Sequence, residues 1–159
     1  MAIRFFAMIK GTISGQILLQ GRTNHSDLIT FELRNPGEIF PIATYQVDTA
    51  ADGSYILSDV KPGNYDLTAK ASNFLRAKQT NITVTSGEVT SNINFGLLGG
   101  DANGDNSVGT ADMLILKAAW LSTQGDPNWD LRADFNGDAS IGTTDMLIMQ
   151  GNWLKSGTE

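Results

Sequence analysis

The first hundred residues alternate apolar and polar positions in short runs that are separated by turn residues. Successive side chains of a strand point to opposite faces, so a period of two predicts half-buried β-strands. Turn sequences stand at Asn35-Pro36-Gly37, Asp52-Gly53 and Pro62-Gly63. Runs spaced this closely leave no room for crossover helices, so we expect an antiparallel β-sandwich. The expected strands cover residues 12–19, 28–34, 43–49, 53–57, 63–71, 80–85 and 90–95.

After residue 109 the apolar positions change to a helical pattern. Residues 110–121 carry an apolar arc wider than the ~100° stripe that covers one core contact, and the run that ends at Leu154 repeats it. A unit of two such helices is too small to bury that whole surface, and leftover apolar area tends to be an interaction site. We expect Trp120, Trp153 and the Leu and Ile positions to form a shared core, and the Met and Thr positions to face outward.

The helical segment is an internal duplication, because residues 101–121 recur as residues 134–154, an offset of 33 positions. In each copy, oxygen-bearing side chains occupy positions 1, 3, 5, 7 and 12 of a loop that runs directly into the expected helix. This is the spacing by which a 12-residue EF-hand loop surrounds a hard cation, with position 7 contributing its main-chain carbonyl. The candidate metal ligands are Asp101, Asn103, Asp105, Ser107 and Asp112 in the first copy and Asp134, Asn136, Asp138, Ser140 and Asp145 in the second.

The ligand types favour Ca²⁺, which takes six to eight oxygen ligands at ~2.3–2.6 Å, over Mg²⁺ with its stricter octahedron. An Asx-rich turn before an N-capped helix would also explain one such cluster, but two copies in the same phase favour two calcium sites. Position 6, where glycine normally turns the chain, is Asn106 in one loop and Ala139 in the other. A left-handed backbone costs Ala about 1–2 kcal/mol, so we expect the second loop to bind its ion more weakly.

Residues 99–159 resemble the dockerin family. The resemblance rests on two loops of the form Asp-x-Asn-x-Asp-x-x-x-x-x-x-Asp, each leading into a helix, with Asp at position 12 in place of the usual Glu. Residues 94–100 are too short and too glycine-rich to form the helix that precedes a full EF-hand loop. The resemblance implies two F-hand loop–helix units packed antiparallel, two bound calcium ions, and binding to a cohesin, a β-sandwich receptor on a cellulosome scaffold or a cell surface.

The same resemblance places partner contacts at loop positions 10 and 11 and on the helix beyond them. The candidate partner-binding residues are Thr110, Ala111, Leu114, Lys117 and Ala118 in the first copy and Thr143, Thr144, Leu147, Gln150 and Gly151 in the second. The near symmetry of the copies implies that a receptor accepts the unit in two orientations, with differences such as Lys117 against Gln150 biasing the choice. The subtype-specific residue pairs of the family are absent, so the cohesin type stays open.

Residues 10–97 resemble the transthyretin-like or carboxypeptidase-regulatory-like β-sandwiches. The resemblance rests on Asp-Gly-Ser-Tyr at 52–55 and Pro-Gly-Asn-Tyr at 62–65, with an entry strand upstream. It implies an accessory, spacer or adhesion role. We therefore expect an α+β multidomain chain of the X-module–dockerin type, with a β-sandwich at residues 1–98 and an all-α dockerin at residues 99–159. Only residues 97–100 join them, which is too short for a flexible tether and predicts a fixed pair.

Acidic side chains concentrate in the last sixty residues. Residues 1–99 contain eight acidic and eight basic side chains, whereas residues 100–159 contain nine acidic and three basic, so the second part carries the whole net charge of −6. Two Ca²⁺ ions would reduce that charge to −2. Without metal the loop carboxylates repel one another, so we expect the apo unit to be partly unfolded. The acidity argues against nucleic acid, whose binding needs clustered Lys and Arg.

Candidate catalytic chemistry is sparse. His25 is the single histidine, there is no cysteine, and no spacing selects a catalytic pair of carboxylates. We expect His25 to lie in a solvated loop, and we expect no enzyme activity. The apolar run at residues 5–9 is too short for a membrane span or a signal peptide. We therefore expect no membrane insertion, and we interpret the chain as the C-terminal part of a longer protein that is extracellular or attached to a cell surface.

Two classes of function compete. The favoured class is a calcium-dependent docking module that is monomeric until it binds a cohesin, anchors its parent protein for polysaccharide degradation, and uses the sandwich as a stabilising spacer. The alternative is an extracellular adhesion or carbohydrate-binding protein whose calcium sites are only structural. A cytosolic calcium sensor fits less well, because sensor loops lie between the paired helices of full EF-hands.

Overall fold

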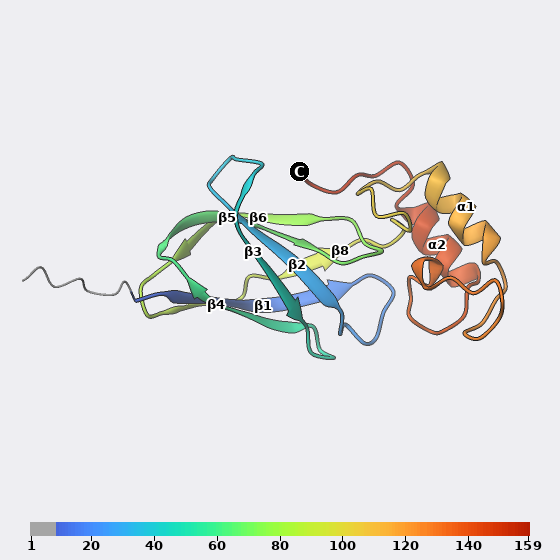
Figure 1. Ribbon diagram of the computed structural model, residues 1–159, viewed down its shortest axis with the longest axis horizontal. Helices are drawn as coiled ribbons and strands as arrows, with labels where there is room; N and C mark the ends of the chain where they lie inside the picture. Colours follow the sequence, from blue (N-terminus) through green and yellow to red (C-terminus); the bar gives the residue numbers. More distant parts are fainter. Residues whose placement is uncertain (1–8) are drawn as a thin grey trace, which may run out of the picture.

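Eight strands precede two α-helices and a short 3₁₀ helix in the computed structural model, which describes residues 9–159 (Figure 1). The apolar run at residues 5–9 lies outside the described residues except for Ile9, as does the start of the expected first domain. The strands are β1 Gly11–Leu19, β2 Leu28–Arg34, β3 Pro41–Asp48, β4 Ser54–Val60, β5 Gly63–Lys70, β6 Ala77–Val84, β7 Val89–Thr90 and β8 Phe95–Leu97. The helices are α1 Thr110–Ala118, η1 Leu131–Ala133 and α2 Thr143–Gly151.

The strands form two sheets with a shared core. One sheet is antiparallel throughout, in the order β3-β2-β5-β6, and the other has β1 between β4 and the pair β7 and β8. Alternate side chains of β1 and β2 point inward, so that Ile13, Ile17 and Phe31 are fully buried. The core also contains Leu19, Ile29, Leu33, Tyr55, Leu57, Leu67, Phe95 and Leu97. The chain is thus mostly β-sheet with two helices, and the expected sandwich is present.

The expectation of a wholly antiparallel sandwich is wrong for the last two strands, because β7 and β8 run parallel to β1. They also replace the single strand expected at residues 90–95. Ile13 pairs with Thr90 but Ile17 pairs with Phe95, so the later segment is one residue longer than β1 over this stretch, as in a bulge. Asn92 lies inside that segment with a left-handed φ of 64°. Alternation reports which face is buried and not the strand direction, so the pattern could not reveal this pairing.

His25 is half-buried rather than solvated. Its Nδ1 atom accepts a hydrogen bond from the Leu19 main-chain N–H at 3.0 Å. Its main-chain carbonyl accepts one from the Thr49 hydroxyl at 2.7 Å. The histidine therefore ties the end of β1 to the end of β3, and the expectation of a solvated loop residue is corrected.

The helical unit has a core of its own. Leu116 of α1 and Met149 of α2 are fully buried, together with Phe135 from the segment between the helices. Leu75 from the sandwich belongs to the same cluster, so the two cores meet. None of the helices in residues 9–159 is long and apolar enough to cross a membrane.

Both helices end three residues before the apolar pattern does. The chain leaves helical geometry ahead of Leu121 and Leu154, which have left-handed φ values of 59° and 62°. As a result Trp153 is 38% exposed and Trp120 is only partly buried, whereas Met149 is fully buried. The expected division is therefore corrected for Met149, which is in the core, and for Trp153, Leu114 and Leu147, which are exposed, whereas Trp120 does pack against the core.

The sandwich and the helical unit lie end to end, and the C-terminal residues return along the sandwich (Figure 1). Gln20 accepts hydrogen bonds through Oε1 from the Asn152 side chain at 2.6 Å and from the Gly99 N–H at 3.1 Å. Arg22 donates from Nε to the Phe135 carbonyl at 3.1 Å. Asn152 is 1% exposed, so its bond to Gln20 lies inside the interface. These contacts support the expectation that the two parts form a fixed pair.

Gly53, in the Asp-Gly turn before β4, lies tightly against the backbone of β1. Its φ is 82°, and a Cβ atom there would lie 1.9 Å from the Ile17 carbonyl oxygen. We predict that Gly53→Ala lowers the free energy of unfolding by more than the ~1–2 kcal/mol that left-handed backbone alone costs. The added Cβ would clash with the main-chain carbonyl of Ile17, which cannot move aside as a flexible side chain can. Urea unfolding measures the change.

Gly37→Ala is the matched control, because φ is 79° there but no atom lies within 4 Å of the added Cβ. It should cost only the backbone contribution. Equal losses in the two variants would contradict the prediction.

Candidate metal loops and docking surface

Each copy of the repeat forms a loop that ends in the first turn of a helix. Asp112 is the third residue of α1 and is 1% exposed. It accepts hydrogen bonds from the Gly109 N–H at 2.8 Å and from the Asn103 N–H at 3.0 Å. Asp145 is held in the same way at the start of α2. A carboxylate here suits the positive end of the helix dipole, so position 12 both caps the helix and faces the loop.

Consecutive Asx turns shape both loops. Asn103 Oδ1 accepts the Asp105 N–H at 2.9 Å, and Asp105 Oδ1 accepts the Ser107 N–H at 2.9 Å. In the second loop the two equivalent hydrogen bonds measure 3.1 and 2.8 Å. Because each side chain bonds to the backbone two residues on, the chain curls through positions 3, 5 and 7 in both copies.

Position 6 adopts the left-handed conformation in both loops, although neither residue there is glycine. The φ values are 69° at Asn106 and 64° at Ala139. Asn106 Oδ1 also accepts the Arg76 main-chain N–H at 2.7 Å, which links the first loop to the sandwich. Ala139 has no polar side-chain atom with which to offset its backbone strain of about 1–2 kcal/mol.

The buried carboxylates at position 1 are unequally satisfied. Asp101 is fully buried, and its Oδ2 accepts the Asn106 N–H at 3.0 Å and the Lys70 ammonium at 2.7 Å. Its Oδ1 is buried without a hydrogen-bond partner. At Asp134, by contrast, both oxygens accept main-chain N–H groups. An unpartnered buried carboxylate oxygen is costly, so Asp101 Oδ1 is the atom that best fits a cation held by the first loop.

The loop carboxylates do not converge on their own. In residues 9–159, no three Asp, Glu, His or Cys side chains lie close enough together to form a preassembled metal site. Burial raises the pKa of Asp145, main-chain N–H groups lower it, and the neighbouring Asp134 carboxylate raises it further. Negative charge is thus disfavoured where the loop meets α2. The donor set suits calcium, and a bound cation would offset the repulsion among the loop carboxylates.

Each loop pairs with the segment that follows the other helix. After α1, the Leu121 N–H donates to the Ile141 carbonyl at 3.0 Å, and the Ile141 N–H donates to the Ser122 carbonyl at 2.8 Å. The segment after α2 makes the same two bonds with Val108, at 2.9 and 2.8 Å. This reciprocal pairing explains why the helices end early. Sequence reasoning missed it, although the repeat continues past both helix ends to Trp-Leu and so carried a signal.

All ten candidate partner residues are exposed. Leu114 and Leu147, at equivalent positions of α1 and α2, are 61% and 60% exposed. An apolar hollow of about 210 Å³ joins the two helices and is lined by Met113, Leu116, Lys117, Trp120 and Met146. Sequence reasoning did not foresee three further exposed apolar side chains that follow the helix ends, which are Leu121, Trp153 and Leu154.

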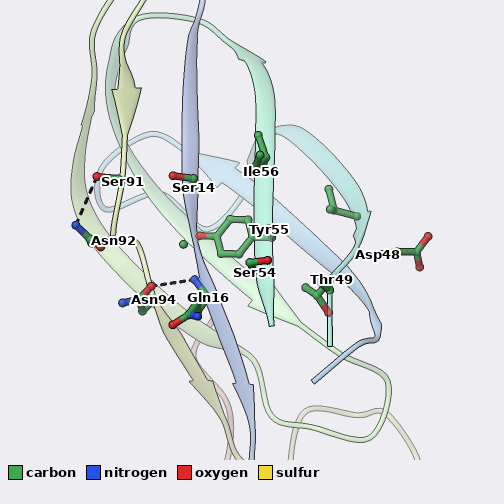
Figure 2. Close-up of a pocket in the computed structure, with 13 residues that line it drawn as sticks. Ser14, Gln16, Asp48, Thr49, Ser54, Tyr55, Ile56, Ser91, Asn92 and Asn94 are labelled. Carbon is green, nitrogen blue, oxygen red and sulfur yellow. Dashed lines mark hydrogen bonds between the residues drawn. The ribbon is translucent and has the colours of Figure 1, made fainter. Parts of the chain in front are cut away.

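A hollow of about 720 Å³ opens on the sandwich, over β1, β4 and the segment that carries Asn92 and Asn94 (Figure 2). Its lining is rich in hydroxyl and amide side chains, and Asp48 is the one carboxylate among the lining residues. The Tyr55 hydroxyl donates to the Ile93 carbonyl at 2.6 Å, and burial raises the pKa of Tyr55.

Asn106 joins the first loop to both the sandwich and the C-terminal tail, because its main-chain carbonyl also accepts the Gly157 N–H at 2.8 Å. We predict that Asn106→Ala lowers the free energy of unfolding by about 1–3 kcal/mol, since the Arg76 N–H loses its acceptor. The left-handed backbone adds to the loss. Chemical denaturation measures it, and Ala139→Asn is the matched control, which should be neutral or stabilising. A comparable loss in that control would count against this account.

Comparison with known families covers both parts of the chain. A family model described as carboxypeptidase regulatory-like domain matches residues 32–98, and one described as dockerin type I domain matches residues 99–152. Domains of these classes are structural and docking modules rather than catalytic ones, and dockerin type I domains bind calcium. No curated protein sequence matches the chain.

Two solved structures share the fold of both parts of the chain. A C-terminal interface mutant of the type II cohesin–X–dockerin complex from Acetivibrio cellulolyticus matches with a TM-score of 0.74 and 20% identity, over 92% of this chain and 97% of that chain. An N-terminal interface mutant of the complex matches with a TM-score of 0.71 at the same identity and coverage. The end-to-end arrangement of sandwich and helical unit is therefore a shared fold. Residues 32–98 thus match the carboxypeptidase regulatory-like family, and residues 99–152 match the dockerin type I family.

Proposed function

We propose that the chain is a calcium-dependent docking module. Its dockerin domain, residues 99–159, binds a cohesin and anchors the parent protein to a scaffold or a cell surface, while the sandwich of residues 1–98 acts as a stabilising spacer. The observation that carries the proposal is that all ten candidate contact residues are exposed on a domain matched as a dockerin. The module has no catalytic role and binds no nucleic acid, and it is monomeric until it meets its receptor.

Two calcium ions are the proposed cofactors, one in each F-hand loop–helix unit. In the first loop Asp101, Asn103, Asp105 and Asp112 would hold the ion through side-chain oxygens, and Ser107 through its main-chain carbonyl. The second loop would use Asp134, Asn136, Asp138, Asp145 and the Ser140 carbonyl. Each ion supplies charge that offsets three carboxylates and so draws the loop onto the start of its helix. Because Ala139 holds a left-handed backbone, the second site is the weaker one.

Cohesin binding is supported by the chemistry of the helix surface. Leu114 and Leu147 form its apolar centre, and the remaining candidate positions are small or polar. An apolar centre within a polar rim is the usual anatomy of a protein interface. The two similar solved structures are chains of a cohesin–X–dockerin complex, and they have the same two-part fold. Cellulosomal dockerins typically act outside the cell or at its surface, where calcium is plentiful, and we assign this chain there.

The alternative function, glycan binding or adhesion through the sandwich, has the 720 Å³ hollow of Figure 2 as its site. Hydroxyl and amide side chains such as Ser14 and Asn94 would suit sugar hydroxyls. The aromatic side chain in this hollow, Tyr55, is only 3% exposed, so its ring is not available for stacking on a sugar. The docking proposal is therefore favoured.

A pull-down of the full chain against a panel of type I and type II cohesins tests the proposal. We expect capture by at least one cohesin in calcium and loss of capture in EDTA, because a loop that loses its ion no longer fixes the start of its helix and the contact residues on that helix. Capture by none, or equal capture in EDTA, would sink the docking function. Glycan-array binding that survives EDTA and is lost in Asn94→Ala would support the alternative.

The apolar centre gives a second test. We predict that Leu114→Ala combined with Leu147→Ala weakens cohesin binding by about 30-fold or more, because buried apolar anchors are worth about 1–3 kcal/mol each and every 1.4 kcal/mol is a factor of ten. Calorimetric titration measures the affinity. The control combines Phe40→Ala with Ile42→Ala, which removes apolar side chains that are 75% and 53% exposed on the sandwich. A larger effect from this control than from the leucine pair would place the receptor elsewhere.

A further inference from the structure

Lys70, the last residue of β5, places its ammonium group on a carboxylate of the first loop. Its Nζ lies 2.7 Å from Asp101 Oδ2 and also donates to the Ala71 carbonyl at 3.1 Å and to the Phe74 carbonyl. An ammonium group has three donors, and these three acceptors satisfy them. Because β5 is an inner strand between β2 and β6, the sandwich fixes this cation in place.

The second loop has no equivalent cation. Across residues 9–159, the Lys70–Asp101 pair is the only ion pair that joins a candidate loop ligand to a basic side chain. Arg22 reaches the second loop from the sandwich, but it donates there to a main-chain carbonyl and forms its ion pair with Asp27 at 3.2 Å. Two loops that match in sequence therefore differ in electrostatic support.

We propose that Lys70 is a positioning residue that serves as the built-in counter-ion of the first loop. It lets this loop keep its folded form without calcium, whereas the second loop needs the ion. The inference rests on the proposed calcium-binding function of the loops. The Lys70 ammonium and the Asn106 N–H both donate to Asp101 Oδ2, whereas the buried Asp101 Oδ1 accepts no hydrogen bond. Oδ1 therefore stays available as a ligand atom for calcium.

The position of the pair makes its effect strong. The Lys70 side chain is 16% exposed and that of Asp101 is fully buried, so solvent and salt screen the pair far less than a surface pair. Removing one partner of such a pair leaves an uncompensated buried charge. The first loop then loses the contact that fixes the carboxylate at position 1, and with it the hydrogen bond from the Asn106 N–H to the same oxygen.

Amide hydrogen exchange of the full chain in EDTA tests the proposal at two matched reporters. The Asn106 N–H donates to Asp101 Oδ2 at 3.0 Å, and the Ala139 N–H donates to Asp134 Oδ2 at 3.1 Å. We expect the Asn106 amide to exchange about tenfold or more slowly than the Ala139 amide. Lys70→Met should abolish that difference by speeding exchange at Asn106 alone, and the charge-preserving Lys70→Arg should retain most of it.

Lys78→Met is the matched control, because the Lys78 ammonium donates to the Glu159 main-chain oxygen at 3.2 Å and contacts no loop carboxylate. It should leave both reporters unchanged. Asp101→Asn removes the charge from the loop side without altering the sandwich, and it should release the Asn106 amide as well. This variant decides the matter if Lys70→Met fails to fold. Equal exchange at the two reporters in the wild-type chain, or an unchanged Asn106 amide in both variants, overturns the proposal.

Calcium added to the same samples separates this inference from the proposed function. The ion should slow exchange in the second loop of the wild-type chain and restore protection of the Asn106 amide in Lys70→Met, because it brings the missing positive charge. If calcium slowed exchange in neither loop, the proposed calcium binding would be contradicted. The comparison made in EDTA would still decide what Lys70 does.

Discussion

Six carboxylates confined to two short loops are the constraint on which the dockerin domain depends. To hold the proposed calcium ion, each loop must bring three Asp side chains toward one point, and like charges at short range oppose this. Main-chain N–H groups of the Asx turns and the helix N-termini offset part of the repulsion, and the proposed cation would offset the rest. Asp112 and Asp145 are candidate loop ligands and also first-turn residues of α1 and α2. The state of each loop therefore fixes where its helix starts and where Leu114 and Leu147 point.

The reciprocal pairing of loops and helix ends makes this dependence mutual. The segment after α1 bonds to Ile141 beside the second loop, and the segment after α2 bonds to Val108 beside the first. Disorder in one loop therefore releases the end of the other helix. The left-handed Leu121 and Leu154 show that this pairing is strong enough to impose a conformation that a leucine resists by about 1–2 kcal/mol.

Local sequence patterns predicted most of the strands and the positions of the candidate ligands. Alternation and ligand spacing are properties of a few consecutive residues, so the strands at residues 28–34 and the paired loops could be read from them. Strand direction is not local, and the parallel pairing of β7 and β8 with β1 was therefore missed. The early helix ends were missed because tertiary pairing, not propensity, sets them. Lys70 lies 31 residues from Asp101, and nothing in its own segment marks it as a partner of the loop.

Because the two domains are rigidly joined, the near symmetry of the docking surface affects where the sandwich lies when the dockerin is bound. Leu114 and Leu147 would look alike to a receptor, which is why two binding orientations follow from the repeat. The sandwich, however, is bonded to one arrangement of the repeats: Gln20 holds Asn152 of the second copy, and Lys70 holds Asp101 of the first. A twofold rotation of the dockerin on its receptor would therefore carry the sandwich and everything attached to it to the opposite side. Two orientations on a cohesin would thus mean two directions in which the parent protein leaves the scaffold, because no flexible tether stands between the domains to absorb the difference.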